Sequence, residues 1–82
     1  MKISVTQKNI VEGERGSCRR DPVALAMIDD KIICPWVSPT SISWMDKHGF
    51  KKSTETPEDV LQFMKMFDNG EYVEPFDLQL ET

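Results

Sequence analysis

Hydrophobic and polar residues alternate in short runs along this chain, and the period of each run indicates which element it forms. Segment 2–6 alternates with a period of two, which is typical of a strand with one buried face. Segments 40–44 and 76–80 alternate in the same way, and segment 50–54 is expected as the strand that returns from the turn after 40–44. Segment 32–39 is apolar but contains Pro35 and Pro39. Because proline cannot donate to a ladder, we expect an edge strand or a connector there.

Two segments carry the start signals and the apolar spacing of helices. Asp21 is expected to cap the first helix and Pro22 to occupy its first position, where a missing N–H costs nothing. Its apolar stripe comprises Val23, Ala24, Met27 and Ile28. Thr56 and Pro57 predict a second helix with the same signals, which ends near Gly70. The stripe of the second helix comprises Val60, Phe63, Met64 and Phe67.

The order of these elements predicts the fold class. One further helical turn is expected between Thr6 and Gly13, and Gly49 predicts a tight turn that joins 40–44 to 50–54 as a hairpin. Strand, helix, strand, strand, helix, strand is the split βαβ order of ferredoxin-like folds. We therefore expect one α+β domain over residues 1–82, built as a single layer of four antiparallel strands with two helices on one face.

With 82 residues the chain has the length of one domain, and no segment is long and apolar enough to span a membrane. The first residues turn polar too soon for a secretory signal, so we expect a cytoplasmic protein. Cys18 and Cys34 would form a disulfide only in an exported protein, and we expect reduced thiols, one or both part-buried. Together with His48 they supply only three ligands at irregular spacing, too few for a typical zinc site.

No set of residues has the composition of a catalytic site. His48 is the only imidazole and falls in the predicted hairpin turn, where side chains usually face solvent. The carboxylate pairs 29–30 and 58–59 lie at a helix end and a helix start, where capping and solvation explain them. Gly13 and Gly16 lack the strand-to-helix context of a phosphate-binding loop. We therefore expect no enzyme activity, no cofactor and no metal.

The net charge of −4 conceals two halves of opposite sign. Residues 1–52 carry nine Lys/Arg and six Asp/Glu, a balance of +3, whereas residues 53–82 carry one basic and eight acidic residues, a balance of −7. A dipolar surface of this kind can steer a charged partner, although two solvated faces would give the same split.

Candidate partner-binding residues fall into three groups. Arg15, Arg19 and Arg20 form the densest basic cluster, in a loop ahead of a helix start, where they either hold an anion or an acidic surface or remain solvated. Trp36 lies between prolines in a segment that cannot pair fully, which favours a partner-binding anchor. The general expectation for the large aromatic residues is nevertheless the core: Trp36, Trp44 and Tyr72. The acidic group comprises Glu55, Glu58, Asp59, Asp68, Glu71 and Glu74.

Nucleic acid is an alternative ligand, because RNA-recognition domains share the ferredoxin-like sheet. Segment 47–52 has a basic-Gly-aromatic order that resembles the start of their third-strand motif. However, Ile3 and Val5 stand where the first strand would need a stacking aromatic, and a net acidic chain disfavours phosphate contacts. The favoured interpretation is a hairpin turn followed by a core Phe50.

Two stretches, one near each end of the chain, carry a further pattern. The first comprises Val5-Thr6-Gln7 with Ile10 and Gly13, then Cys18 and Pro22-Val23-Ala24-Leu25-Ala26. The second comprises Phe67-Asp68-Asn69-Gly70 with Val73, Pro75 and Phe76. This pattern resembles a family of small, mostly uncharacterised proteins of tailed bacteriophages and prophages, and residues 30–55 take no part in it. The family has a second cysteine where this chain has Asp21, so its thiol pair is lacking here and a capping role at this position is favoured.

The resemblance implies a phage origin and no particular enzymatic activity. Small acidic phage proteins often bind and block a host enzyme, anti-CRISPR proteins among them. We therefore expect a non-enzymatic accessory protein, a monomer or homodimer, that inhibits a host protein such as a nucleic-acid-handling or defence complex. It would use its acidic region 55–81, with Trp36, Arg19 and Arg20 in docking. The alternatives are a nucleic-acid-binding hairpin at 47–52 and a structural or self-associating virion component.

Overall fold

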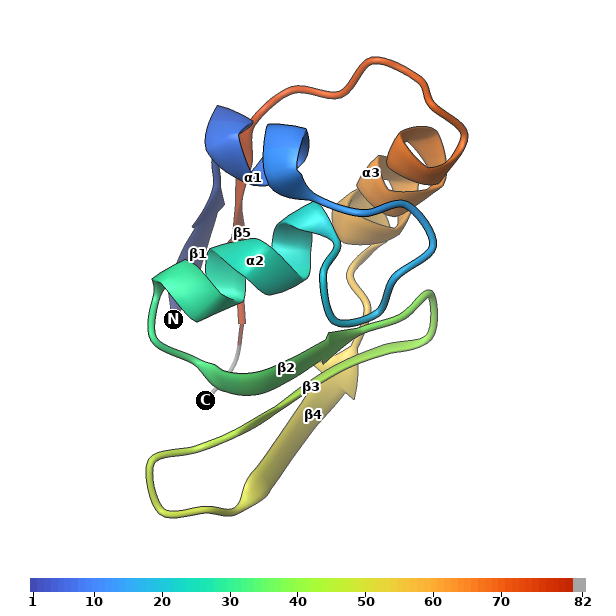
Figure 1. The fold of residues 1–82 in the computed structure, drawn as a ribbon. Coiled ribbons are helices and arrows are strands. Elements are labelled where there is room, and N and C mark those ends of the chain that lie inside the picture. The colour runs from blue at the N-terminus through green and yellow to red at the C-terminus, as the bar shows by residue number, and fades with distance from the viewer. Residues whose placement is uncertain (81–82) are drawn as a thin grey trace.

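Strands and helices alternate irregularly along residues 1–80, the part of the chain that the computed structural model describes (Figure 1). In chain order they are β1 (Lys2–Val5), α1 (Gln7–Glu12), α2 (Pro22–Asp29), β2 (Ile33–Val37), β3 (Ser41–Met45), β4 (Lys51–Glu55), α3 (Glu58–Asp68) and β5 (Phe76–Gln79). Over these residues no helix has the length and apolar character needed to cross a membrane.

The strands form two separate sheets, so the prediction of a single four-stranded layer is wrong. β1 pairs antiparallel with β5, while β2, β3 and β4 form a second antiparallel sheet in that order. In the ferredoxin-like arrangement the first strand would lie beside β4. Only residues 38–40 separate β2 from β3, so these strands pair as neighbours in sequence, and β4 keeps a free edge. The prediction of two helices is also wrong, because α1 is a third.

Helix α2 lies between the two sheets and packs against β1 and β2 (Figure 1). Val23, Ala24 and Met27 are fully buried, whereas Ile28, predicted on the same stripe, is exposed. The small Ala24 lets the helix backbone approach its neighbours closely. Both sheets and α3 contribute to the same core, with Ile3, Val5, Val37, Ile42, Trp44, Val60, Leu78 and Leu80 among its members.

Asn9 fixes α1 to the end of α2. Thr6 caps α1 as predicted, because Asn9 N–H donates to Thr6 Oγ1 (3.3 Å) and Thr6 N–H donates to Asn9 Oδ1 (2.8 Å). The buried Asn9 side chain also donates through Nδ2 to Asp29 Oδ2 (2.8 Å). Gly13 ends the helix as predicted, but its φ of −67° is open to any residue. The constraint is contact, since a Cβ there would lie 2.7 Å from the ring of Pro22.

A bulge at Cys34 and Pro35 decides which face of the sheet Trp36 occupies. The pairs on either side of the bulge are Ile33–Met45 and Trp36–Ser43, so β2 uses one residue more than β3 between them. Cys34 takes up the irregularity with a φ of 51°. Because side chains alternate along a strand, the extra residue turns Trp36 outward, where it is 42% exposed. The prediction of an edge strand for this proline-containing segment is confirmed.

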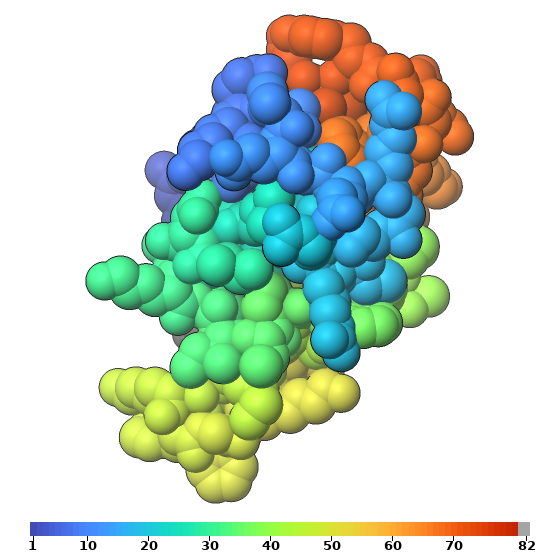
Figure 2. All heavy atoms as spheres, viewed as in Figure 1, coloured from blue at the N-terminus to red at the C-terminus, as the bar shows by residue number. Residues whose placement is uncertain are grey.

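β3 and β4 form the predicted hairpin, with Gly49 at a φ of 84° in its turn. The Asp46 carboxylate accepts hydrogen bonds from His48 N–H (2.8 Å) and Phe50 N–H (2.9 Å), and the second of these is the main cause that lowers the pKa of Asp46. The prediction of a core position for Phe50 is wrong, because its side chain is 69% exposed. The reason is that the hairpin extends beyond the core, as the yellow-green lobe at one end of the molecule (Figure 2).

α3 has the predicted buried stripe but a different start. The prediction that Thr56 caps this helix is wrong, because Pro57 is the cap residue and Thr56 Oγ1 donates instead to the Ser38 carbonyl (2.7 Å). The first turn keeps Glu58 and Asp59, whose charges favour a helix start. The connection from β4 is thereby fastened to the β2–β3 turn rather than to the helix.

Asp21 caps α2 as predicted, in surroundings that disfavour its charge. Its Oδ1 accepts a hydrogen bond from Ala24 N–H (2.7 Å), whereas Oδ2 is buried and finds no partner within residues 1–80. Burial is the main cause that raises the pKa of Asp21 to about 7; the charge of Asp68 acts in the same direction, and the backbone hydrogen bonds from Ala24 and Val23 oppose the shift. This carboxyl group therefore changes its protonation near neutral pH.

We expect the Asp21 contribution to the free energy of unfolding to fall as the pH rises from about 4 to about 7. The folded chain holds the Asp21 proton more tightly than the unfolded chain, whose pKa is near 3.8. The stabilisation is therefore complete below the pKa of the unfolded chain, 3.8, and is lost as the pH rises through the pKa of the folded chain, about 7. This is a change in the free energy of unfolding on the order of 4 kcal/mol. Asp21→Asn keeps a capping oxygen and should remove this slope in urea unfolding across that pH range.

Asp46→Asn is the control for this experiment. The pKa of Asp46 is lowered, so its contribution to stability is lost as the pH falls, and its replacement should leave the Asp21-dependent decrease in place. A slope that is the same in Asp21→Asn and the unmodified chain would contradict the titration assigned to Asp21.

Candidate partner-binding site

The side chains most suited to catalysis or metal binding lie apart. His48 is exposed in the hairpin turn, and both cysteines are free thiols, with Cys18 half-buried and Cys34 exposed. In the described part of the chain, no group of three or more His, Cys, Asp and Glu side chains is placed to hold a metal ion. The described surface also carries hollows that exposed side chains line.

The three arginines of the predicted basic cluster are exposed and lie beside separate neighbours. These neighbours are Gly70 for Arg15, the ring of Trp36 for Arg19 and the carboxylate of Glu14 for Arg20. The Arg19 guanidinium carbon lies 5.5 Å from the centroid of the Trp36 ring, a cation–π contact. The arginines therefore do not converge on one anion pocket, and the helix start behind them is occupied by the side chain of Asp21.

Trp36 and Arg19 border an apolar hollow of about 500 Å³ between α2 and β2. Its other lining residues are Ile28, Ile32, Cys34 and Pro35. The tryptophan is accessible here, as a docking anchor requires, although Arg19 covers part of its ring. The hollow has one positive charge and no acidic lining residue, so it lies apart from the acidic surface expected from the sequence.

A groove of about 650 Å³ lies between α3 and the segment that leads into β5. Phe63 forms its buried wall, with its ring centroid 4.7 Å from that of Phe76 and 6.3 Å from that of Phe67. The residues that line the groove are Asp59, Gln62, Phe63, Met66, Tyr72, Val73, Glu74, Pro75, Phe76 and Asp77. The groove thus combines a base of packed aromatic rings with polar residues around it.

Tyr72 projects from this groove into solvent. The expectation that Tyr72 belongs to the core is wrong, because its side chain is 77% exposed. It lies in the irregular segment between α3 and β5, where Val73 occupies the core position instead. Met66 on the adjacent turn of α3 is also exposed. An exposed tyrosine beside an exposed methionine is the composition of a protein-binding surface.

Carboxylates line the same groove, whereas none of its described lining residues is a lysine or an arginine. Asp59 lies at the start of α3, Glu74 lies on the facing segment and Asp77 lies on β5. A hydrogen bond with the Ser4 side chain lowers the pKa of Asp77, and Lys2, 3.4 Å from the carboxylate, acts in the same direction. Asp77 is therefore charged at neutral pH.

The six acidic residues predicted to bind a partner do not share one surface. Only Asp59 and Glu74 lie on the groove. The others lie elsewhere: Glu55 on β4, Glu58 in the first turn of α3, Asp68 in its last turn and Glu71 in the segment that follows. Sequence reasoning missed Tyr72, Met66 and Asp77 as members of the site. The sequence does contain a signal for the exposure of Tyr72. The segment from Gly70 to Pro75 has no apolar periodicity, so no pattern places Tyr72 on a buried face.

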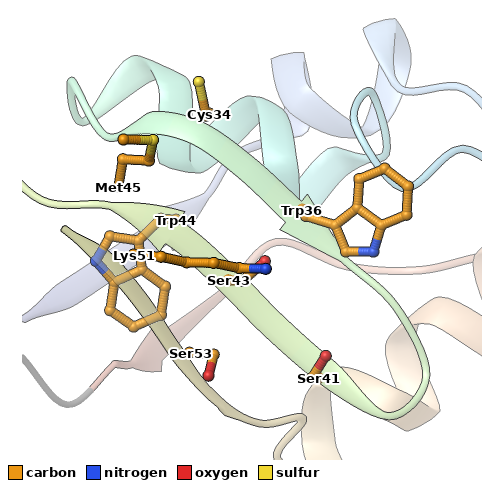
Figure 3. A pocket seen from close by; sticks show the side chains of 8 residues that line it. All are labelled: Cys34, Trp36, Ser41, Ser43, Trp44, Met45, Lys51 and Ser53. Carbon is orange, nitrogen blue, oxygen red and sulfur yellow. The ribbon is translucent and has the colours of Figure 1, made fainter. Parts of the chain in front are cut away.

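The outer face of the three-stranded sheet carries a third hollow, of about 430 Å³ (Figure 3). Its lining residues are Cys34, Trp36, Ser41, Ser43, Trp44, Met45, Lys51 and Ser53. The three serines lie between the two tryptophans in this view. Ser53 and Lys51 come from β4, so this face is continuous with the free edge of the sheet.

No protein-family model, curated protein or solved structure matches this chain significantly. The fold and the surface define its class: a small α+β domain in which two antiparallel sheets pack around a helix and an acidic, aromatic groove lies beside α3.

Tyr72→Ala should change the free energy of unfolding by no more than about 0.5 kcal/mol, because an exposed side chain away from the core contributes little to stability. Phe63→Ala should lower it by about 3–5 kcal/mol, since this ring is buried against two others. Urea unfolding at constant pH measures both values. A large loss in Tyr72→Ala would assign Tyr72 to the fold rather than to a binding surface.

Proposed function

We propose that this chain is a binding protein without a catalytic step of its own, and that its groove beside α3 receives a cationic segment of a partner protein. The segment would carry at least one apolar side chain to cover Tyr72. The observation that carries the proposal is the presence of an exposed tyrosine and three carboxylates, those of Asp59, Glu74 and Asp77, in one groove.

The composition of the groove supports this kind of partner. Tyrosine is enriched among the residues that contribute most to protein interfaces, because it buries a large area with little loss of side-chain freedom. A surface of one charge sign attracts and orients a partner of the opposite sign. All residues that line the groove lie in the half of the sequence with a balance of −7.

The resemblance to tailed-phage proteins supports a partner from the infected host. Proteins that handle nucleic acid present basic surfaces to phosphate groups, and an acidic groove can occupy such a surface in their place. We propose that the chain acts as an inhibitor of a host protein of this type, a nucleic-acid-handling or defence complex.

Selection from a library of short random peptides tests the groove directly. The unmodified chain should enrich peptides that combine Lys or Arg with an aromatic or aliphatic residue. Tyr72→Ala and Glu74→Lys should each weaken binding of a selected peptide by about tenfold, measured by fluorescence anisotropy. Glu71→Lys is the matched control, because it makes the same charge change on a residue outside the groove lining and should have little effect.

The same variants then serve in capture from host lysate, with quantitative mass spectrometry. We expect the unmodified chain and Glu71→Lys to retain a basic host protein. Tyr72→Ala and Glu74→Lys should lose it. Enrichment of neutral or acidic peptides, or equal binding by all variants, would contradict the proposed groove.

A nucleic-acid-binding hairpin is a second candidate, favoured by the exposure of Phe50. Lys47, Lys51 and Lys52 are exposed in the same hairpin, so it combines a ring for stacking with three positive charges. It extends away from the acidic groove as a lobe of its own (Figure 2).

This second candidate predicts a salt-dependent affinity for single-stranded RNA. With three phosphate contacts, the logarithm of the association constant should fall against the logarithm of salt concentration with a slope of about −2. Phe50→Ala should weaken binding, whereas Lys8→Ala, in α1, should not. Fluorescence anisotropy with labelled RNA measures both effects, and binding that is absent or independent of salt would exclude this function.

A further inference from the structure

The free edge of β4 presents backbone groups to solvent in a defined pattern. Thr56 N–H donates to the Thr40 carbonyl (3.2 Å) and Asp46 N–H donates to the Phe50 carbonyl (2.9 Å). These two bonds show that the even-numbered residues of β4 exchange hydrogen bonds with β3. The N–H and C=O groups of the alternate residues consequently point away from the sheet: Lys51, Ser53 and Glu55.

The other edge of this sheet is occupied. On the outer side of β2, Val37 N–H donates to the Cys18 carbonyl (2.8 Å), so the loop before α2 covers that edge. β4 is the last strand on the open side and pairs only with β3 among the strands of residues 1–80. An uncovered edge of this kind is a template for another strand, so the sheet can be extended at β4.

The charges of β4 are complementary to those of a second β4. Lysines on an edge strand usually discourage pairing with other chains. Here Ser53 lies midway between Lys51 and Glu55, so a two-fold axis through Ser53 places Lys51 of one copy opposite Glu55 of the other. Lys52 then lies opposite Thr54, and no pair of like charges is directly opposed. Opposite charges across a strand pair stabilise it, whereas like charges destabilise it.

We propose that two copies of this chain associate through β4 as antiparallel strands centred on Ser53, which joins their three-stranded sheets into one. Lys51, Ser53 and Glu55 exchange backbone hydrogen bonds with the second copy. The side chains of Lys51 and Ser53 lie on the outer, serine-lined face of the sheet (Figure 3), and Glu55, two residues beyond Ser53 on β4, belongs to the same face. The β4 edge and the groove beside α3 belong to different elements, so this inference stands independently of the proposed function.

Charge exchange on β4 tests the dimer. Light scattering at increasing concentration should show a mass that rises from 9.4 kDa toward twice that value. Lys51→Glu should weaken association by about tenfold, because it replaces two opposite-charge pairs by two like-charge pairs. Lys51→Glu combined with Glu55→Lys should restore it. Lys52→Glu makes the same charge change on the inner face, opposite Thr54, and should leave the dimer intact.

Amide exchange gives a second measurement that does not depend on the charges. The Ser53 N–H points to solvent in the single chain, so its hydrogen exchange should slow as the protein concentration rises. The N–H of Lys52 is bonded to β3 and should be protected at every concentration. Any of three results would overturn the proposal. The first is a mass of 9.4 kDa at all concentrations, and the second is a dimer whose association does not change in Lys51→Glu. The third is a Ser53 amide whose exchange slows only when another extended peptide is added.

Discussion

Burial of α2 between two small sheets is the constraint on which the rest of this structure depends. Sheets of two and three strands have little stability alone, so each needs an apolar surface from elsewhere, and one short helix supplies it to both. The two ends of that helix are therefore fixed by polar contacts. Asp21 caps its start at the cost of a buried carboxyl oxygen, and Asn9 holds its end through Asp29. Close packing also explains Gly13, which leaves no room for a side chain beside Pro22.

The exposed apolar residues follow from the same arrangement. A core centred on α2 does not reach the hairpin tip or the segment after α3, so Phe50 and Tyr72 remain outside. The bulge in β2 adds Trp36 to this group, because one additional residue reverses the face on which it lies. In a domain of this size, large apolar side chains that the core does not use are available for contacts with other molecules.

Local sequence signals predicted most of the helices and strands, but they did not predict how the strands assemble into sheets. The caps Thr6 and Asp21 and the hairpin turn at Gly49 are determined by neighbouring residues, and the structure confirms them. The separation into two sheets depends on which strands meet, and alternation within a strand carries no such information. Exposure of Phe50 was unpredictable for the same reason, since it depends on how far the core extends, whereas the aperiodic segment around Tyr72 was an available signal. Of the acidic residues, the sequence located Asp59 and Glu74 but could not show that only these two share a groove.

The groove beside α3 and the edge of β4 lie on different elements, so the two proposed surfaces are compatible with each other. Carboxylates border the groove beside α3, whereas lysines lie on the hairpin and on β4. A dimer through β4 would pair its lysines with glutamates and would leave both grooves uncovered. Two grooves in one particle raise the effective concentration of each for a partner with repeated basic segments, so weak binding at one groove would be reinforced by the other. In such a dimer the open edge of β4 would have a function that it lacks in an isolated domain.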